Sequence, residues 1–143
     1  MAANSRLTIA IHALAWMALA QRRGVAVLTS AQVAASVNTN PVIIRRSLGE
    51  LRRAGLVEVR HGAGAGWWLA RRPEEITLLD VYQAVEQEPL FGMHHAEPNL
   101  TCPVGHGIRP VLGKVYGGVE QTLRHELGRT SIAEVLRQTS QVR

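Results

Sequence analysis

Residues 29–70 read TSAQVAASVNTNPVIIRRSLGELRRAGLVEVRHGAGAGWWLA, and this stretch decides the fold. Its first four residues, TSAQ, form a capping-box pattern that predicts a helix from there to about Val37. A turn follows, in which Asn40 is placed to cap a second helix and Pro41 to occupy its first position. Two helices joined by a tight turn predict a helix-turn-helix.

The second of these helices has one apolar face and one basic face. A spacing of i, i+4 and i+7 places Ile44, Leu48 and Leu51 on the same side, where they predict contact with a core. Gly55 is placed to end the helix, as the residue beyond its C-terminal cap. The basic side chains fall away from the apolar stripe and are Arg45, Arg46, Arg52 and Arg53.

A β-hairpin is predicted directly after this helix. Residues 56–60 (LVEVR) and 67–70 (WWLA) have the composition of strands, and the HGAGAG between them is typical of a flexible turn. A hairpin in this place is a wing, so the predicted fold is a winged helix-turn-helix. The turn also resembles a phosphate loop, but it lacks the GK[ST] ending and joins strand to strand, which argues against nucleotide binding.

The segment before this unit predicts a helix over residues 7–21 that is apolar on almost every side. The run Leu7–Ala20 is interrupted only by Thr8 and His12. A membrane span needs roughly twenty apolar residues, so we expect a buried helix with no membrane crossing. We also expect no signal peptide, because no basic segment precedes the run. One chain of this size hardly buries such a helix, which suggests a partner chain.

The segment after the wing predicts a short helix beginning at residues 77–80, a loop over 87–107 and a long helix over 108–127. The loop has no periodicity and contains three prolines and three glycines. Ser131 is placed to cap a last short helix. We therefore expect a winged helix-turn-helix domain in residues 1–86, a sensor-type loop in 87–107, and a dimerisation helix with a C-terminal helix in 108–143. The fold class is mostly α with a small β-hairpin.

The predicted long helix carries an apolar stripe close to heptad spacing. Two glycines lie one turn apart within it, and each costs about 1 kcal/mol relative to alanine, which indicates close packing of another helix. That helix is either a second copy of the chain or the first helix of the same chain, and the two readings are compatible. The expected homodimer interface consists of Leu112, Val115, Val119, Leu123, Gly113 and Gly117.

Composition restricts the class of protein further. With 46% apolar and 19% charged residues, the 143-residue chain has the composition of a folded domain and not of a disordered one. The single cysteine, Cys102, allows no intrachain disulfide and fits a reducing, cytoplasmic setting, although an intermolecular bridge stays open.

The positive charge of the chain is concentrated. Residues 41–72 hold seven arginines against two glutamates, and this surplus equals the net charge of +5 of the whole chain. Such a concentration favours a polyanionic partner over a merely solvated helix face. Arginine is the residue suited to bidentate contacts with phosphate and guanine, so double-stranded DNA is the expected partner.

Three stretches carry a family resemblance: LGELRRAGLV at 48–57, GWWLAR at 66–71, and ITLLDV at 76–81 with AVE at 84–86. They resemble the Rrf2 family of bacterial winged helix-turn-helix transcriptional regulators (IscR/NsrR-like). The NLTCPVG at 99–105 is similar to a single-cysteine branch of that family. The resemblance implies a homodimer whose long helices cross and which presents two winged helices to a pseudo-palindromic operator. We expect a DNA-binding regulator, and specifically a repressor.

The N-terminal half of the second helix is expected to enter the major groove, since that end of a recognition helix usually reads the bases. Contacts to base edges are expected from Val42, Arg45 and Arg46, and contacts to phosphates from Arg52 and Arg53. Asn40 caps the helix and is also a candidate phosphate donor. Arg60 and His61 border the wing tip, where a cation enters a narrow minor groove. In relatives this tip often has a proline and a third consecutive glycine where Ala63 and Ala65 stand here.

The loop around the cysteine is the candidate sensor. Cys102 lies near His106 and near the start of the long helix, which favours a reactive thiolate and a redox response. His12 is a further candidate, because in some family members a residue of the first helix completes the other subunit's cluster. A hydrogen-bonded residue in a packed helix is the simpler interpretation of His12.

A metal centre is the alternative for the same loop. The candidate ligands are Cys102, His94, His95 and His106, whose spacing matches no standard metal motif. Cluster-binding relatives carry three cysteines in this loop, so the single cysteine disfavours an iron–sulfur cluster, and we expect no cofactor. A metal- or cluster-dependent regulator of the same fold stays the alternative function.

Two functions of other classes are weighed against the regulator. A thiol-based enzyme would use the cysteine with a histidine, but no second cysteine and no paired carboxylates accompany them. We therefore expect no enzyme. A winged helix used only for protein contacts would favour an acidic or apolar second helix, and this one carries four arginines.

Overall fold

The structure is a computed structural model, which describes residues 4–142. Residues 1–3 and 143 of the expected domains lie outside this range. The described chain is mostly helical with one two-stranded antiparallel sheet, which confirms the expected fold class. Its elements are α1 (Arg6–Arg22), α2 (Ser30–Val37), α3 (Pro41–Arg53), β1 (Val57–Arg60), β2 (Gly66–Leu69), the 3-10 turn η1 (Pro73–Glu75), α4 (Leu78–Val85), α5 (Pro103–Gly128) and α6 (Ile132–Thr139).

The helix-turn-helix is set by side chains that cap its helices. Thr29 Oγ1 accepts from the Gln32 backbone N–H at 3.1 Å, and Gln32 Oε1 accepts from the Thr29 N–H at 2.9 Å. Asn40 Oδ1 accepts from the Val42 N–H at 2.8 Å, and Pro41 takes the first position of α3. The predicted caps and the predicted turn between α2 and α3 are therefore confirmed.

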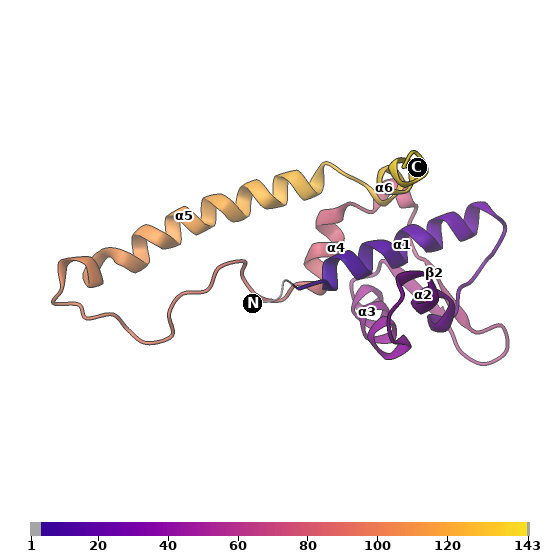
Figure 1. The fold of residues 1–143 in the computed structure, drawn as a ribbon, viewed down its shortest axis with the longest axis horizontal. Coiled ribbons are helices and arrows are strands. Elements are labelled where there is room, and N and C mark those ends of the chain that lie inside the picture. Colours follow the sequence, from indigo (N-terminus) through magenta and orange to yellow (C-terminus); the bar gives the residue numbers. More distant parts are fainter. Residues whose placement is uncertain (1–3, 143) are drawn as a thin grey trace.

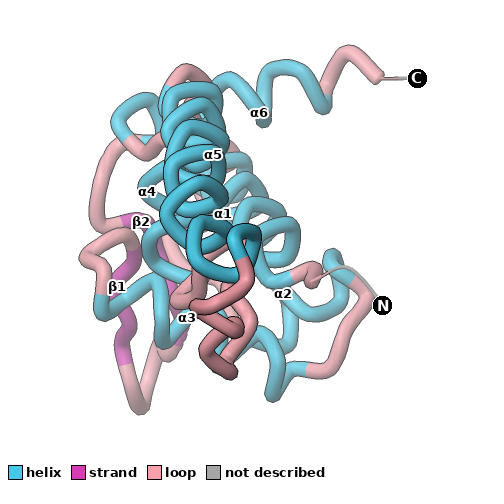
Figure 2. The backbone as a smooth tube through the Cα atoms, turned by 90° about the vertical axis from the view of Figure 1, so that its left-hand side faces the viewer, coloured by secondary structure: helices cyan, strands magenta, loops and turns pink. Residues whose placement is uncertain are grey.

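The predicted wing is present: β1 begins one residue later than expected and ends at the expected residue, and β2 is displaced by one residue toward the N-terminus. β1 and β2 pair with Val57 opposite Leu69 and Arg60 opposite Gly66. Leu28 extends this sheet through a bridge to Trp67, with N···O distances of 3.0 and 2.8 Å. The segment before α2 comes so close to β2 that a Cβ on Gly66 would lie 2.8 Å from that of Val27. Figure 2 shows the two strands at one edge of the helical body.

Helix α1 forms the centre of this body and contacts α2, α3, α4, α6 and β2 (Figure 1). The residues that face these neighbours are largely small, with Ala10, Ala13 and Ala18 all buried beside Leu14 and Met17. Small side chains let several elements approach the helix closely from different sides. The elements of its own chain therefore bury one side of α1, and the apolar residues that stay partly exposed on it are Leu7, Ile9, Ile11, Trp16 and Leu19. The expectation of a partner chain for this helix stays a prediction.

Helix α6 belongs to the same body although it follows the long helix in sequence. The backbone N–H of Ile132 donates to Ile76 O at 2.8 Å, and that of Leu78 donates to Thr130 O at 2.9 Å. Ile132 and Leu136 are buried in the core. The chain thus leaves the body after α4 and returns to it at α6.

The excursion between α4 and α6 forms an arm, in which α5 and the preceding loop run beside each other away from the body (Figure 1). The expected start of the long helix at Ile108 is wrong, since α5 begins at Pro103. Proline suits the first position of a helix, and Cys102 precedes it at the N-cap position. The first turn carries no apolar periodicity, which is why the sequence pattern places its start too late. None of the 26 residues of α5 is buried.

We find no helix within residues 4–142 that combines the length and the apolar character needed to span a membrane.

Candidate nucleic-acid interface

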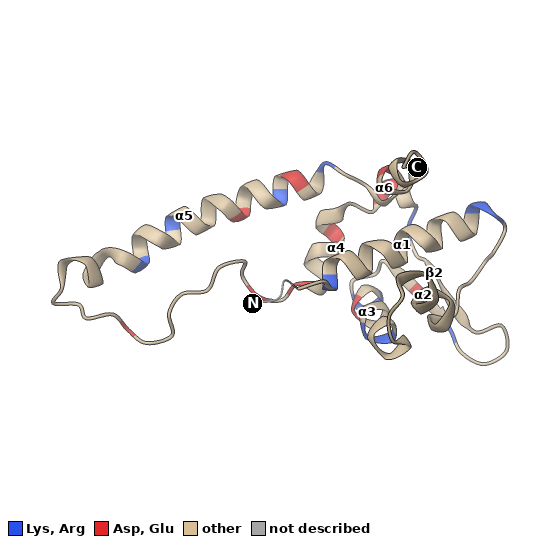
Figure 3. Ribbon diagram, viewed as in Figure 1, with Lys and Arg blue, Asp and Glu red and all other residues tan. Residues whose placement is uncertain are grey.

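Helix α3 presents its arginines to solvent because its other face is anchored in the core. Ile44, Leu48 and Leu51 are completely buried, as the spacing predicts. Val42 lies on the outer side and is 59% exposed. Arg45, Arg46, Arg52 and Arg53 are exposed as well, and Figure 3 shows the basic positions on the outer side of this helix.

Most of this positive charge is not neutralised by neighbouring carboxylates. Of the seven arginines in residues 41–72, four have no carboxylate oxygen of the described residues within 4.0 Å, namely Arg45, Arg52, Arg53 and Arg60. Arg46 Nε lies 3.8 Å from Glu50 Oε1, which is too long for a hydrogen bond, and the Arg46 side chain is 77% exposed. Solvent-exposed pairs of this kind contribute little stability, so Arg46 is available to a polyanion.

The wing and α3 meet in one hollow of the surface. Its lining includes Arg45 from α3 and Arg60 and His61 from the wing, together with Thr29 and Ser30 at the start of α2. The Arg60 guanidinium lies 6.0 Å from the centroid of the Trp68 ring. Trp67, which precedes it on β2, packs instead against the core. Three elements therefore bring cationic groups and a helix N-terminus to the same place.

Sequence reasoning misses Thr29 and Ser30 as residues of this surface. The signal was present, because a capping box marks a helix N-terminus and such ends favour anions. Asn40 lies on the same helix-turn-helix with an exposed side chain, whose Oδ1 is used in capping α3.

The candidate sensor cysteine lies at the start of α5, at the end of the arm farthest from the body (Figure 1). Cys102 is exposed, and hydrogen bonds from the backbone N–H groups of Gly105 and Val104 lower the pKa of its thiol. His106 follows one helical turn later, and its N–H donates to Cys102 O at 2.9 Å. His12 instead forms a hydrogen bond of 2.9 Å with Ser36 Oγ in the body. The described chain thus places Cys102 and His12 in separate parts of the molecule.

The candidate metal ligands of the loop are not assembled into a site. The rings of His94 and His95 stack with their centroids 4.8 Å apart. Arg109 ties this part of the loop to α5, because its Nη2 donates to His94 O at 2.8 Å and to Ala96 O at 3.0 Å. Between residues 4 and 142, no three His, Cys, Asp or Glu side chains converge in a way that could hold a metal ion.

The residues expected in a helix-to-helix interface fall on two faces of α5. Leu112 is half-buried and lines a pocket with loop residues, and a Cβ on Gly113 would lie 3.7 Å from Met93 Cε. These two positions therefore face the chain's own loop. Val115 and Val119 are 53% and 40% exposed, and the same outward flank carries Val104 and Val111, which sequence reasoning misses. Gly117 borders open space, and Leu123 is half-buried.

A comparison with protein families gives a match over nearly the whole chain. The Rrf2 model, described as "Iron-dependent Transcriptional regulator", matches residues 3–138. Protein-bound iron takes thiolate, imidazole or carboxylate ligands. This chain has one cysteine, and its described residues 4–142 bring no three such groups together. The residues of a single chain therefore do not fit an iron centre.

Individual relatives agree with the family match. YwnA of Bacillus subtilis (strain 168) is 38% identical over 135 residues, which cover 93% of this chain and 96% of that protein. The HTH-type transcriptional regulator IscR of Cereibacter sphaeroides is 28% identical over 128 residues, with 90% and 82% of the two chains covered. The solved structure of T. potens IscR has the same fold, with a TM-score of 0.70, 20% identity, and coverage of 97% of this chain and 88% of that one. The chain belongs to the Rrf2 family of DNA-binding transcriptional regulators.

Proposed function

We propose that this regulator binds a pseudo-palindromic operator as a homodimer and acts as a repressor in the cytoplasm. The observation that carries the proposal is the common surface of α3 and the wing, where Arg45 and Arg60 line one hollow and neither has a carboxylate of residues 4–142 within 4.0 Å. A thiol-based enzyme is excluded as an alternative, because the matched family consists of transcriptional regulators.

Sequence reading is assigned to the N-terminal half of α3. The residues on its exposed side are Val42, Arg45 and Arg46. The two arginine side chains are long enough to reach base edges in a major groove. Arginine binds the O6 and N7 of guanine with two parallel hydrogen bonds, so we expect guanines among the bases that are read.

Positioning on the phosphate backbone is assigned to the residues around this reading end. Arg52 and Arg53 lie farther along α3, and Asn40 lies at its start. The N-terminus of α2, beginning at Thr29 and Ser30, adds backbone N–H groups on the wing side of the hollow. Arg60 and His61 lie at the wing, where we expect them to enter the adjacent minor groove.

The homodimer is supported by the apolar flank of α5, which comprises Val104, Val111, Val115 and Val119. These four valines are 40–68% exposed in one chain, and they follow helical spacing along an arm that projects from the body (Figure 1). A second copy of α5 packed on this flank would remove the valines from water. Two winged helices related by a two-fold axis match an operator with two similar half-sites.

Substitutions within α3 test the assignment of its arginines. Arg45→Ala and Arg46→Ala should each weaken binding to the preferred operator by about 1–3 kcal/mol and relax the sequence preference, because each removes a base contact. Arg53→Ala should weaken all sequences alike and reduce the dependence on salt, because it removes a phosphate contact. Fluorescence anisotropy with a selected operator and a scrambled duplex, over a series of salt concentrations, measures both effects.

A variant away from the surface serves as the matched control for this series. Arg129→Ala removes an exposed arginine whose ion pair with Glu126 lies at the end of α5, and it should leave DNA affinity unchanged. If all three α3 variants bound the operator as strongly as the wild type does, the assignment would be refuted. A wild-type protein without salt-dependent DNA binding would favour the protein-contact winged helix instead.

We also propose that oxidation of Cys102 releases the regulator from DNA. The backbone hydrogen bonds that lower the pKa of this exposed thiol favour the thiolate, which is the reactive form. The thiolate sulfur attacks a peroxide oxygen, the O–O bond breaks, and the cysteine becomes a sulfenic acid while hydroxide leaves. Condensation with the Cys102 thiol of a second copy would then form an intersubunit disulfide and release water.

The pH dependence of Cys102 alkylation tests this proposal. Because the folded-state pKa is lowered, the thiolate should persist to lower pH in the folded protein than in the urea-unfolded chain. The midpoint of the iodoacetamide reaction rate against pH should therefore lie lower for the folded protein. In the same preparation, peroxide should release operator DNA from the wild type and not from Cys102→Ser. Equal midpoints, or equal release from both proteins, would contradict thiol sensing.

A further inference from the structure

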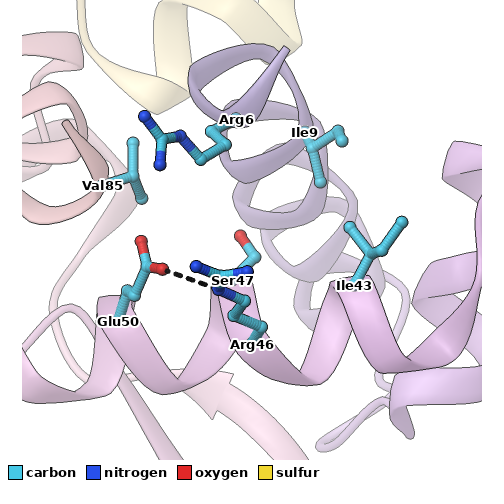
Figure 4. A pocket seen from close by; sticks show the side chains of 7 residues that line it. All are labelled: Arg6, Ile9, Ile43, Arg46, Ser47, Glu50 and Val85. Atoms are coloured by element: carbon cyan, nitrogen blue, oxygen red, sulfur yellow. Dashed lines mark ion pairs between the residues drawn. The ribbon is translucent and has the colours of Figure 1, made fainter. Parts of the chain in front are cut away.

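A small pocket lies between the recognition helix and the rest of the body, on a side of α3 that faces α1 and α4. Its volume is about 100 Å³. Figure 4 shows the side chains that surround it, which come from three helices: Arg6, Ile9, Ile43, Arg46, Ser47, Glu50 and Val85. The functions assigned above to α3 use its outer face and leave this pocket unexplained.

The apolar part of the pocket is supplied by Ile9 from α1, Ile43 from α3 and Val85 from α4. Ile43 is 47% exposed, so an apolar side chain stands open at this place although the core lies next to it. Apolar walls with a few convergent polar groups are the usual composition of a small-molecule site.

One polar group in the pocket is buried without a partner. Ser47 Oγ is inaccessible to solvent and makes no hydrogen bond to any of the residues described. A buried hydroxyl without a hydrogen bond costs free energy, so such groups in native proteins usually have a partner. Ser47 lies among the lining residues, so a rotation about its Cα–Cβ bond that turns the hydroxyl into the pocket would allow a hydrogen bond to a bound molecule.

The charged groups around the pocket are two arginines and two carboxylates. Arg6 and Arg46 line it together with Glu50, and Glu86 lies beside it in an ion pair with Arg6. Arg6 donates from Nη2 to Glu86 Oε2 at 3.4 Å and from Nε to Asn4 Oδ1 at 3.2 Å, whereas Arg46 Nε lies 3.8 Å from Glu50 Oε1. A guanidinium group has five N–H donors, so both arginines keep donors for an incoming carboxylate, a planar anion that arginine binds with two parallel hydrogen bonds.

We propose that this pocket binds a small aliphatic carboxylate as an effector of the regulator. The aliphatic part packs on Ile9, Ile43 and Val85, and the carboxylate is bound by Arg6 and Arg46. An α-amino acid and a simple branched acid share this chemistry. Glu50 would favour the amino acid, because its carboxylate is placed to accept hydrogen bonds from an ammonium group, which the simple acid lacks.

Such a ligand would act on DNA binding through Arg46. This step rests on the proposed role of Arg46 in reading bases, since the same side chain lines the pocket and stands on the DNA-facing part of α3. A carboxylate that holds the guanidinium withdraws it from the operator. We therefore expect the effector to lower operator affinity, by about tenfold if the coupling is of ordinary strength.

The first measurement is direct binding without DNA. Isothermal titration of the full-length protein with 4-methylpentanoate, L-leucine and isoamyl alcohol should give binding of the first two and none of the alcohol, which lacks the carboxylate. Arg6→Gln should weaken binding of both acids about tenfold or more, as expected for loss of a charged hydrogen bond. Tighter binding of L-leucine, lost in Glu50→Gln, identifies an amino acid; tighter binding of 4-methylpentanoate identifies a simple acid.

Two variants complete the test. Arg22→Gln removes an exposed arginine at the other end of α1 and should bind both acids as the wild type does. Ile9→Trp fills the pocket and should abolish binding while the circular dichroism spectrum and operator affinity stay unchanged. No heat of binding for either acid, or equal binding by Ile9→Trp, overturns the proposal. Acid binding that leaves operator affinity unchanged overturns the effector role. A ligand-free protein that does not bind DNA overturns the proposed function alone, because the titrations are made without DNA.

Discussion

Val115→Asp is expected to lower the affinity for a complete operator by about two to four orders of magnitude, the range typical of lost bivalent binding. Val115 lies in the middle of the apolar flank of α5 and is 53% exposed in one chain. In a homodimer built on this flank it would be buried, and an unpaired carboxylate there is strongly destabilising. The substitution should therefore separate the two chains without unfolding either.

Two measurements distinguish this effect from a folding defect. Sedimentation velocity should show a dimer for the wild type and a monomer for Val115→Asp at the same concentration. Binding to a single half-site should change much less than binding to the full operator, because each winged helix keeps its own contacts. Gln121→Asp is the matched control, since it adds the same charge to an exposed position about 120° around α5 from Val115. A dimeric Val115→Asp protein would show that the chains pair through another surface.

The local elements of the winged helix could be predicted because short-range chemistry determines them. Asn40 and Pro41 start α3, and the capping box at Thr29 starts α2, through hydrogen bonds within four residues along the chain. The apolar stripe of α3 also follows from its own spacing, so the exposure of Arg45 and Arg53 on the other side was a consequence of helix geometry.

Features that depend on distant parts of the chain could not be predicted in the same way. The burial of α1 depends on α6, whose return to the body after α5 leaves no pattern in the sequence of either helix. The apolar stripe of α5 is wide enough for two partners, and its sequence does not show which residues face which partner. In the structure, Leu112 faces the loop of the same chain and Val115 faces outward.

The candidate site shows the same division between local and distant information. Helical spacing identifies Arg45, and the hairpin pattern identifies Arg60, but their meeting in one hollow with Thr29 depends on how the wing folds back against α2. The bridge between Leu28 and Trp67 makes that connection. The pocket beside Ser47 requires three helices at once, so the pattern of any one helix does not predict it.

Leu14→Ala is expected to destabilise the fold by about 2–5 kcal/mol, a large part of the 5–15 kcal/mol typical of a domain. Leu14 lies on α1 and is completely buried by elements of its own chain. Its truncation would leave a cavity that these helices cannot easily close, because α1 is already packed against them through the buried alanines on either side of Leu14. Urea unfolding followed by circular dichroism measures the change in the free energy of unfolding.

The decisive version of this experiment uses the Val115→Asp protein, which we expect to be monomeric. If α1 is buried by its own chain, Leu14→Ala should cost the same free energy in that background as in the wild type, because the two positions are not in contact and their effects should add. Ile11→Ala, at a half-buried position on the same helix, should cost less in both. If the cost of Leu14→Ala disappears in the monomer, α1 owes its burial to the partner chain, as its sequence first suggested.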